Sequence, residues 1–522
     1  MELVTTFTPI VMFILRIIRT ILDYFTNIIF GLIYLRNTER IECVKNPLLL
    51  ESASSLAEKI RKKKVKSVDV VNAYIARIKE IQPILNVIVE SRFENALEDA
   101  RKVDQMLASR EFSEEELQRR FPFLGVPFSC KESLAVKGMH HTAGLYSNKD
   151  NRASENSEVV ALLKKAGAIP LVTTNVCELC LTWETSNKIY GRTRNPYNVK
   201  RIAGGSTGGE GGLLGAGGSI IGVGSDLAGS IRIPAFFNGV FGHKPSRDIV
   251  SNVGHLPKMG LQYSDFLVSG PLCRYATDLL PMMKILTGDK ASQLNLNKKV
   301  DFSKIKIYYM EDDGGNPLCT PVSKELKTAQ KKVLTYFEAA YNVKPKKVDF
   351  PQMYYSTEIW LNLMKTIQPL QPTLEMKEKF DLKLELLKWL TGNSEFNLST
   401  ILSVIYEFIE GKTPPKEKYI EMERELELEM KDILQNDGIF LYPSFPETAV
   451  YHNETFLKMY NIGYMAIFNI LGLPVTQCPL GLSSKGLPLG IQVVGGLNQD
   501  HLTISVAMEL ERAFGGWRNP HL

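Results

Sequence analysis

Cysteine is scarce in this chain of 522 residues, and its pattern excludes a disulfide scaffold. The seven cysteines are odd in number and have no framework spacing, which favours reduced thiols. The one close pair, Cys177 and Cys180, lacks both a second pair of zinc ligands and a thioredoxin-like context. We therefore predict neither a metal site nor a redox centre.

The sequence also lacks the glycine motifs that hold nucleotides. It contains no G-x-x-x-x-G-K-[ST], and no G-x-G-x-x-G opens a helix with the acidic residue that should follow. A net charge of +5 is small for this length: it suits an anionic membrane surface weakly and gives no reason to expect nucleic acid. We expect no cofactor and no nucleic-acid partner.

The N-terminal 36 residues differ from the rest. Ile, Leu, Phe and Val dominate residues 7–35, a run long enough at about 1.5 Å per residue to cross a bilayer. However, four polar residues share one helical face: Arg16, Arg19, Asp23 and Asn27. This stripe favours an interfacial or tilted helix as much as a span, and an amphipathic helix docked on the domain is the alternative. We predict that residues 1–36 anchor the chain to an intracellular membrane, as a single-pass or a monotopic helix.

Beyond this segment the composition is that of a globular protein, with 44% hydrophobic and 23% charged residues. Residues 37–50 are predicted to be a polar connector, and residues 51–522 the globular part, as several domains or one large one. Within it, residues 374–435 form a helix-rich, charged insertion. Its apolar residues at 384–409 are better explained by core packing than by a membrane-facing or acyl-chain surface.

Strands and helices alternate between residues 120 and 230. Short apolar runs at 124–130, 169–173 and 219–224 read as strands, and residues 157–166 as a helix. Such alternation predicts an α/β fold with a largely parallel sheet covered by helices. Active sites in such sheets usually lie beyond the carboxyl ends of the strands. Lys131 and residues 226–230 are expected at these ends.

Glycine is concentrated in one segment. Between Gly204 and Gly242 there are 14 glycines, of 38 in the whole chain. They have no period and are mixed with Ile, Leu, Phe and Val, which excludes a linker or collagen. We interpret this segment as backbone turned inward to hold a developing oxyanion.

A nucleophile is expected beside such a backbone. Ser230 follows a predicted strand and a tight Ala-Gly turn, so its hydroxyl can project where the N–H groups of residues 227–230 converge. A serine in a glycine-rich turn is usually only a turn residue. Only the surrounding sequence can therefore identify Ser230 as a catalytic residue.

That pattern resembles the amidase signature family. The residues that carry the resemblance are Gly204-Gly-Ser206-Thr-Gly-Gly-Glu210, Gly224-Ser-Asp-x-Ala-Gly-Ser230-Ile-Arg232-x-Pro-Ala and Gly125-Val-Pro-Phe-Ser-Cys-Lys131-Glu. C-terminal motifs also match: Tyr442-Pro-Ser-Phe-Pro446, Asn469-x-x-Gly-Leu-Pro474 and Gly486-Leu-Pro-Leu-Gly-Ile-Gln492. The resemblance implies an amidase domain over residues 51–522, with a signature core at about 120–250. It also implies a large mixed β-sheet covered by helices on both faces.

The resemblance further implies a Ser230–Ser206–Lys131 triad. Ser230 would attack an amide carbonyl, and Lys131 would act through Ser206 as general base, then return the proton to the leaving amine. This requires Lys131 to be uncharged in the resting enzyme. Family members hold the first serine through a cis peptide bond, so Gly205–Ser206 is predicted to be cis.

The remaining site residues are assigned around this triad. The amides of Leu227, Ala228 and Gly229 are the predicted oxyanion donors, and the supporting residues are Thr207, Asp226 and Arg232, the last two bracing the loop. Thr207 replaces the common serine of the family. Ala228 replaces a usual glycine, which questions the loop geometry if that position needs a positive φ.

The predicted substrates are long-chain fatty-acid primary amides and ethanolamides. The apolar N-terminal segment and the apolar residues near 380–409 motivate this prediction. The expected partners are therefore a lipid amide and a membrane contacted by residues 7–35. The sequence does not set the oligomeric state, and a homodimer is left open.

Three alternatives compete with this interpretation. Gly204-x-Ser206-x-Gly208 also matches the nucleophile elbow of α/β-hydrolases, which would need a strand directly before Ser206 and a supporting His. A second alternative keeps the family but makes the chain an amidase of other small amides or an amidotransferase subunit. The third is an inactive, membrane-bound binding protein for lipid amides.

Overall fold

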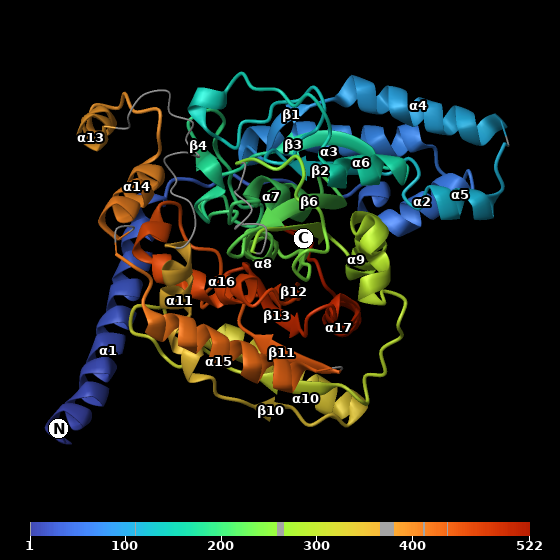
Figure 1. Ribbon diagram of the computed structural model, residues 1–522. Coiled ribbons are helices and arrows are strands. Elements are labelled where there is room, and N and C mark those ends of the chain that lie inside the picture. The colour runs from blue at the N-terminus through green and yellow to red at the C-terminus, as the bar shows by residue number, and fades with distance from the viewer. Residues whose placement is uncertain (1, 110, 258–265, 366–380, 411–412, 436) are drawn as a thin grey trace.

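The computed structural model describes residues 2–109, 111–257, 266–365, 381–410, 413–435 and 437–522. Its centre is a sheet of eleven strands in the order β1-β3-β2-β6-β8-β7-β12-β13-β11-β9-β10, and a separate pair is formed by β4 and β5 (Figure 1). The strands are β1 (Ile88–Ser91), β2 (Pro127–Lys131), β3 (Ile169–Thr174), β4 (Ser186–Asn187), β5 (Gly191–Arg192), β6 (Ile221–Asp226), β7 (Phe241–Lys244), β8 (Val268–Cys273), β9 (Lys306–Tyr309), β10 (Lys346–Lys347), β11 (Gly438–Tyr442), β12 (Val475–Leu482) and β13 (Pro488–Gly495).

Helices surround this sheet (Figure 1). In the N-terminal half they are α1 (Glu2–Ile33), α2 (Ala53–Arg61), α3 (Ser67–Leu85), α4 (Phe93–Ser109), α5 (Glu114–Arg120), α6 (Glu158–Lys165), α7 (Gly208–Gly215) and α8 (Arg232–Phe237). In the C-terminal half they are α9 (Leu279–Leu286), α10 (Lys324–Tyr341), α11 (Ser356–Met364), α13 (Leu382–Leu390), α14 (Leu398–Glu410), α15 (Glu417–Leu434), α16 (Gly463–Ile470) and α17 (Asp500–Phe514).

The sheet is mixed rather than largely parallel. β2 pairs in parallel with β3 and β6, and β9 with β10 and β11. The other neighbours are antiparallel, because β8 enters between β6 and β7, and β12 and β13 are joined as a hairpin. The expectation of a largely parallel sheet was wrong: it holds for β2, β3 and β6, the stretch from which it was drawn, and for β9, β10 and β11, but not for the strands between these two groups. The large mixed sheet implied by the resemblance is confirmed.

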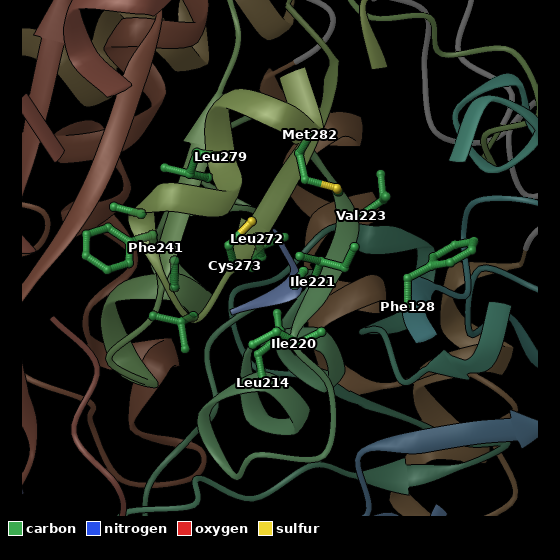
Figure 2. Packing of buried hydrophobic residues seen from close by; sticks show 14 of the residues in the cluster. Phe128, Leu214, Ile220, Ile221, Val223, Phe241, Leu272, Cys273, Leu279 and Met282 are labelled. Atoms are coloured by element: carbon green, nitrogen blue, oxygen red, sulfur yellow. The ribbon is translucent and has the colours of Figure 1, made fainter. Parts of the chain in front are cut away.

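Both faces of the sheet are buried. Along β11, Ile439 and Leu441 belong to one hydrophobic cluster, while Phe440 and Tyr442 belong to a second. Because successive strand residues point to opposite faces, each cluster covers one face. Figure 2 shows part of the first cluster, where side chains of β6, β7 and β8 pack against α9. The strand ends that carry the polar residues Lys131 and Asp226 of the motifs are buried within this covered sheet.

The N-terminal helix α1 extends from the body of the molecule (Figure 1). Its polar stripe faces the domain: Arg19 donates to the carbonyl of Leu457 at 3.0 Å and to the hydroxyl of Thr320 at 3.1 Å, and pairs with Asp23 at 2.9 Å. Large apolar side chains elsewhere on the helix are exposed, including Phe13 at 64%. Within the part of the chain that the structure describes, no helix has the length and apolar character needed to cross a membrane.

Residues 374–435, predicted to be a helix-rich insertion, contain α13, α14 and α15 in their described portions; residues 374–380, 411 and 412 lie outside these portions. Leu426 and Met430 of α15 are buried in the second cluster, and Ile401 of α14 is buried in a third, small cluster. Among the apolar residues at 384–409, core packing is therefore confirmed for Ile401, and Trp389 and Ile405 pack partly buried against the same cluster. In contrast, Leu387 and Leu390 of α13 are exposed.

Candidate active site

Lys131 is the last residue of β2 and is fully buried, as its position at a strand end predicted. Its Nζ lies 2.7 Å from Ser206 Oγ, 2.9 Å from Ser225 Oγ and 3.4 Å from the Ser225 carbonyl oxygen. No carboxylate of the described residues forms an ion pair with it. The neighbouring Glu132 instead accepts from the amides of residues 142 and 143, and burial raises the pKa of Glu132 to about 7. Lys131 is thus a buried amine whose partners are all uncharged.

Ser206 is held in a tight loop before α7. The Gly205–Ser206 peptide bond is cis, which confirms the prediction. Gly205 lies against the backbone of residues 182 and 183, so that a Cβ there would meet the Thr182 carbonyl oxygen at 2.7 Å. The hydroxyl of Ser206 points towards Lys131, whose Nζ lies 2.7 Å away.

Ser230 lies in the turn after β6 and is partly buried. Its carbonyl accepts from the amide of Thr207 at 3.3 Å, which joins the two serine loops. The hydroxyl of Ser230 has no hydrogen-bond partner among the described residues, so the last link of the predicted relay, from Ser206 to Ser230, is not closed here. Such bonds often tighten only when substrate is bound.

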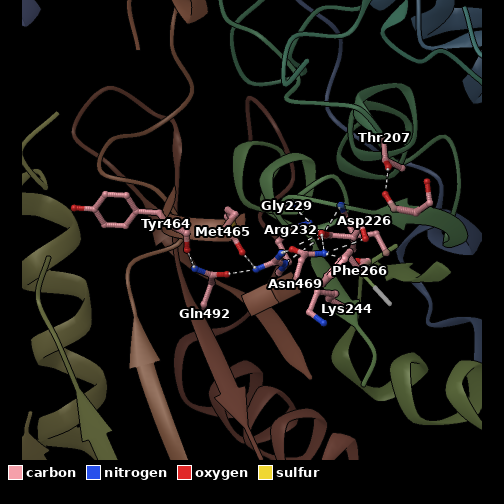
Figure 3. Close-up of polar contacts among 12 residues, drawn as sticks. Thr207, Asp226, Gly229, Arg232, Lys244, Phe266, Tyr464, Met465, Asn469 and Gln492 are labelled. Atoms are coloured by element: carbon pink, nitrogen blue, oxygen red, sulfur yellow. Dashed lines mark hydrogen bonds and ion pairs between the residues drawn. The ribbon is translucent and has the colours of Figure 1, made fainter. Parts of the chain in front are cut away.

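A buried ion pair braces this turn, as Figure 3 shows. Arg232 pairs with Asp226 at 3.0 Å and also donates to Asn469 and Gln492. Burial alone would raise the pKa of Asp226, but the charge and hydrogen bonds of Arg232 hold it well below its usual range. The carboxylate in turn accepts from the amide of Gly229 at 2.7 Å. Both supporting residues thus lie where loop bracing requires.

The amides of the turn divide into two groups. Those of Leu227, Ala228 and Ser230 donate to no acceptor among the described residues, whereas that of Gly229 is taken by Asp226. Gly229 also supplies the positive φ, 108°, and a Cβ there would meet Met465 Cβ at 2.6 Å. Ala228 does not have a positive φ, so its replacement of the family's glycine does not strain the loop.

Four residues that hold the site had no role assigned from the sequence: Ser225, His255, Asn469 and Gln492. Asn469 and Gln492 lie in the C-terminal motifs, which was the signal that could have found them. Ser225 lies inside the signature. His255 lies outside every motif, yet its Nε2 is 2.9 Å from Ser225 Oγ.

The nucleophile-elbow alternative does not fit this geometry. Ser206 is preceded by an irregular segment with only isolated bridges, at Arg194 and Arg201. Among the described residues, no histidine makes a hydrogen bond to it, and its hydroxyl faces Lys131.

The fold and these motifs define an amide-hydrolysing class. A protein-family model described as Amidase matches residues 69–504. The chain therefore belongs to the amidase family, as the signature residues indicated.

Two relatives are similar to this chain over most of its length. Fatty-acid amide hydrolase 2-B of Danio rerio is 46% identical over 91% of this chain and 92% of its own length. Fatty-acid amide hydrolase 2 of Homo sapiens is 45% identical over 91% of each chain. Three further segments of this chain resemble these relatives: residues 187–191, residues 237–246 and the apolar N-terminal segment. A solved fatty acid amide hydrolase has a TM-score of 0.73 at 21% identity, over 91% of this chain and 87% of that one, and shares the fold.

Proposed function

We propose that this chain is a serine hydrolase that cleaves the carboxamide bonds of fatty-acid amides, with Ser230 as nucleophile, Ser206 as proton relay and Lys131 as base. One observation carries the catalytic part of the proposal. Lys131 is buried without a carboxylate and contacts the hydroxyl of Ser206 at 2.7 Å. The proposed role needs the amine in its uncharged form, which is the form that can accept a proton from Ser206.

The proposed reaction has two halves. Ser230 Oγ forms a bond to the amide carbonyl carbon while its proton passes to Ser206, whose own proton passes to Lys131. When the C–N bond breaks, the proton returns through Ser206 to the leaving amine and an acyl-enzyme remains. Water then attacks the ester through the same relay and releases the fatty acid.

The proposed oxyanion donors are the amides of Leu227 and Ala228, because both are unpaired and adjoin Ser230. Gly229, also expected among the donors, is better assigned to loop geometry, since its amide already donates to Asp226. Thr207 supports the loop through the hydrogen bond that its backbone N–H donates to the Ser230 carbonyl. Removal of one such donor typically costs about 100- to 1,000-fold in kcat.

Relatives support the substrate class. Two proteins named fatty-acid amide hydrolase 2 are 45–46% identical to this chain over most of its length. We infer that primary amides and ethanolamides of long-chain fatty acids are the substrates, and that residues 51–522 form the amidase domain behind the connector at 37–50.

Attachment to a membrane interface is part of the same proposal. The polar stripe of α1 is used against the domain, which leaves apolar side chains such as Leu22 and Phe25 exposed. This is the reverse of an ordinary docked amphipathic helix, whose apolar face would be covered. We propose that residues 1–36 bind one leaflet of an intracellular membrane without crossing it.

A fluorophosphonate probe on the full chain tests the catalytic proposal. We expect labelling of the wild type and none of Ser230→Ala, and hydrolysis of oleamide in preference to acetamide. Labelling that persists in Ser230→Ala would contradict the nucleophile. A folded chain that binds oleamide but neither labels nor hydrolyses would be a binding protein instead. Equal turnover of both amides would remove the lipid substrate.

Flotation with phosphatidylcholine–phosphatidylserine vesicles tests the interface. Leu22→Glu places a charge on the exposed side of α1, and Leu497→Glu is a matched change at an exposed leucine of the domain. We expect roughly 10-fold weaker binding for the first only, because a leucine buried in lipid contributes about 1.5–3 kcal/mol. Equal binding by the two variants would contradict the role of α1.

A further inference from the structure

The proposed base, Lys131, has hydrogen bonds on the side away from Ser206 as well. They run from Lys131 through Ser225 to His255, and we call these two residues the arm. Ser225, in β6, lies 2.9 Å from Lys131 Nζ through its hydroxyl, and that hydroxyl lies 2.9 Å from His255 Nε2. His255 is buried. All three side chains are therefore removed from bulk water, and their hydrogen bonds are made with one another.

The segment that follows Lys131 holds His255 in place. Leu134 and His255 form an antiparallel bridge, the amide of Ala135 donates to the Gly254 carbonyl at 2.9 Å, and that of Leu256 donates to the Ser133 carbonyl at 2.8 Å. These backbone bonds tie the loop of His255 to the end of β2. The imidazole is thus fixed relative to the amine by the main chain, not only by side-chain contacts.

The surroundings of the imidazole select one tautomer. Its Nδ1 lies 3.4 Å from the carbonyl oxygen of Pro257, a group that can only accept. Nδ1 therefore carries the proton, and Nε2 presents its lone pair. The nearer hydroxyl at Nε2 is that of Ser225, at 2.9 Å, whereas Ser133 Oγ is 3.5 Å away. Ser225 consequently donates its proton to His255.

The tautomer of His255 determines whether Ser225 donates to the Lys131 amine or accepts from it. Since the hydroxyl proton of Ser225 is committed to His255, its oxygen can only accept from Lys131. An uncharged amine has two N–H groups and one lone pair. The hydroxyl and carbonyl oxygens of Ser225, at 2.9 and 3.4 Å, take the two N–H groups. The lone pair is left for Ser206, at 2.7 Å.

We propose that His255 and Ser225 are positioning residues that orient the lone pair of Lys131 towards Ser206, a role that rests on the catalytic function proposed above. Among the described residues, neither Ser225 nor His255 makes a side-chain hydrogen bond to Ser206 or Ser230, so both act through Lys131. If the imidazole instead donated through Nε2, the Ser225 hydroxyl would be free to turn its proton to the amine and occupy the lone pair.

Burial keeps Nε2 of His255 a hydrogen-bond acceptor. It lowers the pKa of His255 to about 3. The remaining polar groups that face it are the hydroxyls of Ser133 and Ser225 and the Pro257 carbonyl. The imidazole is therefore neutral throughout the pH range in which a serine hydrolase of this kind works.

Steady-state kinetics on the full chain with oleamide test the inference. We expect Ser225→Ala and His255→Phe to lower kcat by roughly 10- to 100-fold, as removal of groups that orient a reactive centre commonly does, with KM nearly unchanged. Fluorophosphonate labelling should slow by the same factor. Ser225→Thr and His255→Gln, which keep a hydroxyl and a carbonyl acceptor, should recover most of the loss.

Ser133→Ala is the matched control, because it removes the more distant hydroxyl at the same nitrogen. We expect its kcat to stay within about two-fold of wild type, because its hydroxyl lies 3.5 Å from Nε2, at the limit of hydrogen-bonding distance. Full kcat in His255→Phe, or equal losses in Ser133→Ala and Ser225→Ala, would overturn the inference. If an alanine or phenylalanine variant does not fold, Ser225→Thr against Ser225→Cys decides, since a thiol accepts poorly: equal kcat in this pair would also overturn it.

The outcome is separable from that of the catalytic proposal. Labelling that survives Ser230→Ala would refute the nucleophile whatever the arm does. Loss of labelling in Ser230→Ala together with full activity in His255→Phe would refute only the arm.

Discussion

Two buried lysines in this molecule have opposite surroundings. Lys458, next to the docking site of α1, is fully buried and forms ion pairs with Glu447 and Glu454, the latter at 2.7 Å. Burial would lower the pKa of Lys458, but the two carboxylates outweigh it and raise the pKa. Lys131 is equally buried and has only hydroxyl and carbonyl oxygens as partners. Burial alone therefore does not identify a catalytic lysine; Lys131 differs from Lys458 in having no carboxylate partner and in contacting the hydroxyl of Ser206 at 2.7 Å.

The largest expected effect is the loss of activity in Lys131→Ala. General base catalysis contributes about 100- to 10,000-fold, and we expect kcat for oleamide to fall towards the upper end of that range. The midpoint of thermal unfolding should change little, because removal of an amine without a counter-ion leaves no orphaned charge. A loss of stability in place of activity would make the two lysines alike.

Lys458→Met should lower the stability of the protein and leave its activity nearly unchanged. It leaves Glu447 and Glu454 buried without their cation, and breaking a buried pair in this way costs about 3–5 kcal/mol. We expect a lower urea midpoint, with kcat of the folded protein near that of the wild type. Lys458→Met with Glu447→Gln and Glu454→Gln is the control, since it removes the stranded charges and should recover part of the stability.

Acid stability distinguishes the arm of Lys131 from the ion pairs of Lys458. The folded-state pKa of His255, about 3, lies below its unfolded value, so its contribution to stability is present above about pH 6.5 and is lost as the pH falls towards 3. His255→Gln removes this proton uptake. We expect its unfolding free energy to fall less steeply, by about 1.4 kcal/mol per pH unit between pH 6 and 4, in urea titrations. Identical slopes would show that His255 is not held neutral.

We expect the smallest effect on stability from substitution of a third buried lysine, Lys244. It donates to the Pro245 carbonyl at 3.0 Å, and burial, with the charge of Arg232, lowers its pKa to about 7. A depressed folded-state pKa means that stability rises with pH between about 7 and 10. Lys244→Met should remove this rise and add about 1–2 kcal/mol at pH 7. Destabilisation at pH 7 would show that Lys244 resembles Lys458 instead.

The sequence was sufficient for those parts of the site that lie in continuous motifs. Lys131 at a strand end, the cis bond before Ser206 and the bracing pair Asp226–Arg232 all lie where the motifs predicted. Spacing along the chain sets these features, because a strand end, a turn and a short helix follow one another with few residues between them.

Contacts between distant segments could not be predicted in this way. His255 reaches Ser225 across 30 residues, through backbone bonds with the chain after Lys131 that no periodicity reveals. The amide of Gly229 was expected at the oxyanion, but the carboxylate of Asp226 turns back and takes it. The antiparallel part of the sheet was missed because alternation was visible only near β2, β3 and β6.

The polar contacts of α1 have a geometric consequence. Arg19 is fastened to the main chain at Leu457 and to the side chain at Thr320, so the helix cannot roll about its own axis without breaking both bonds. A helix that cannot roll presents one fixed side outward. In the proposed attachment to a membrane interface, the catalytic body would be held above the lipid at a single tilt, and substrates leaving the lipid would meet the enzyme from one direction.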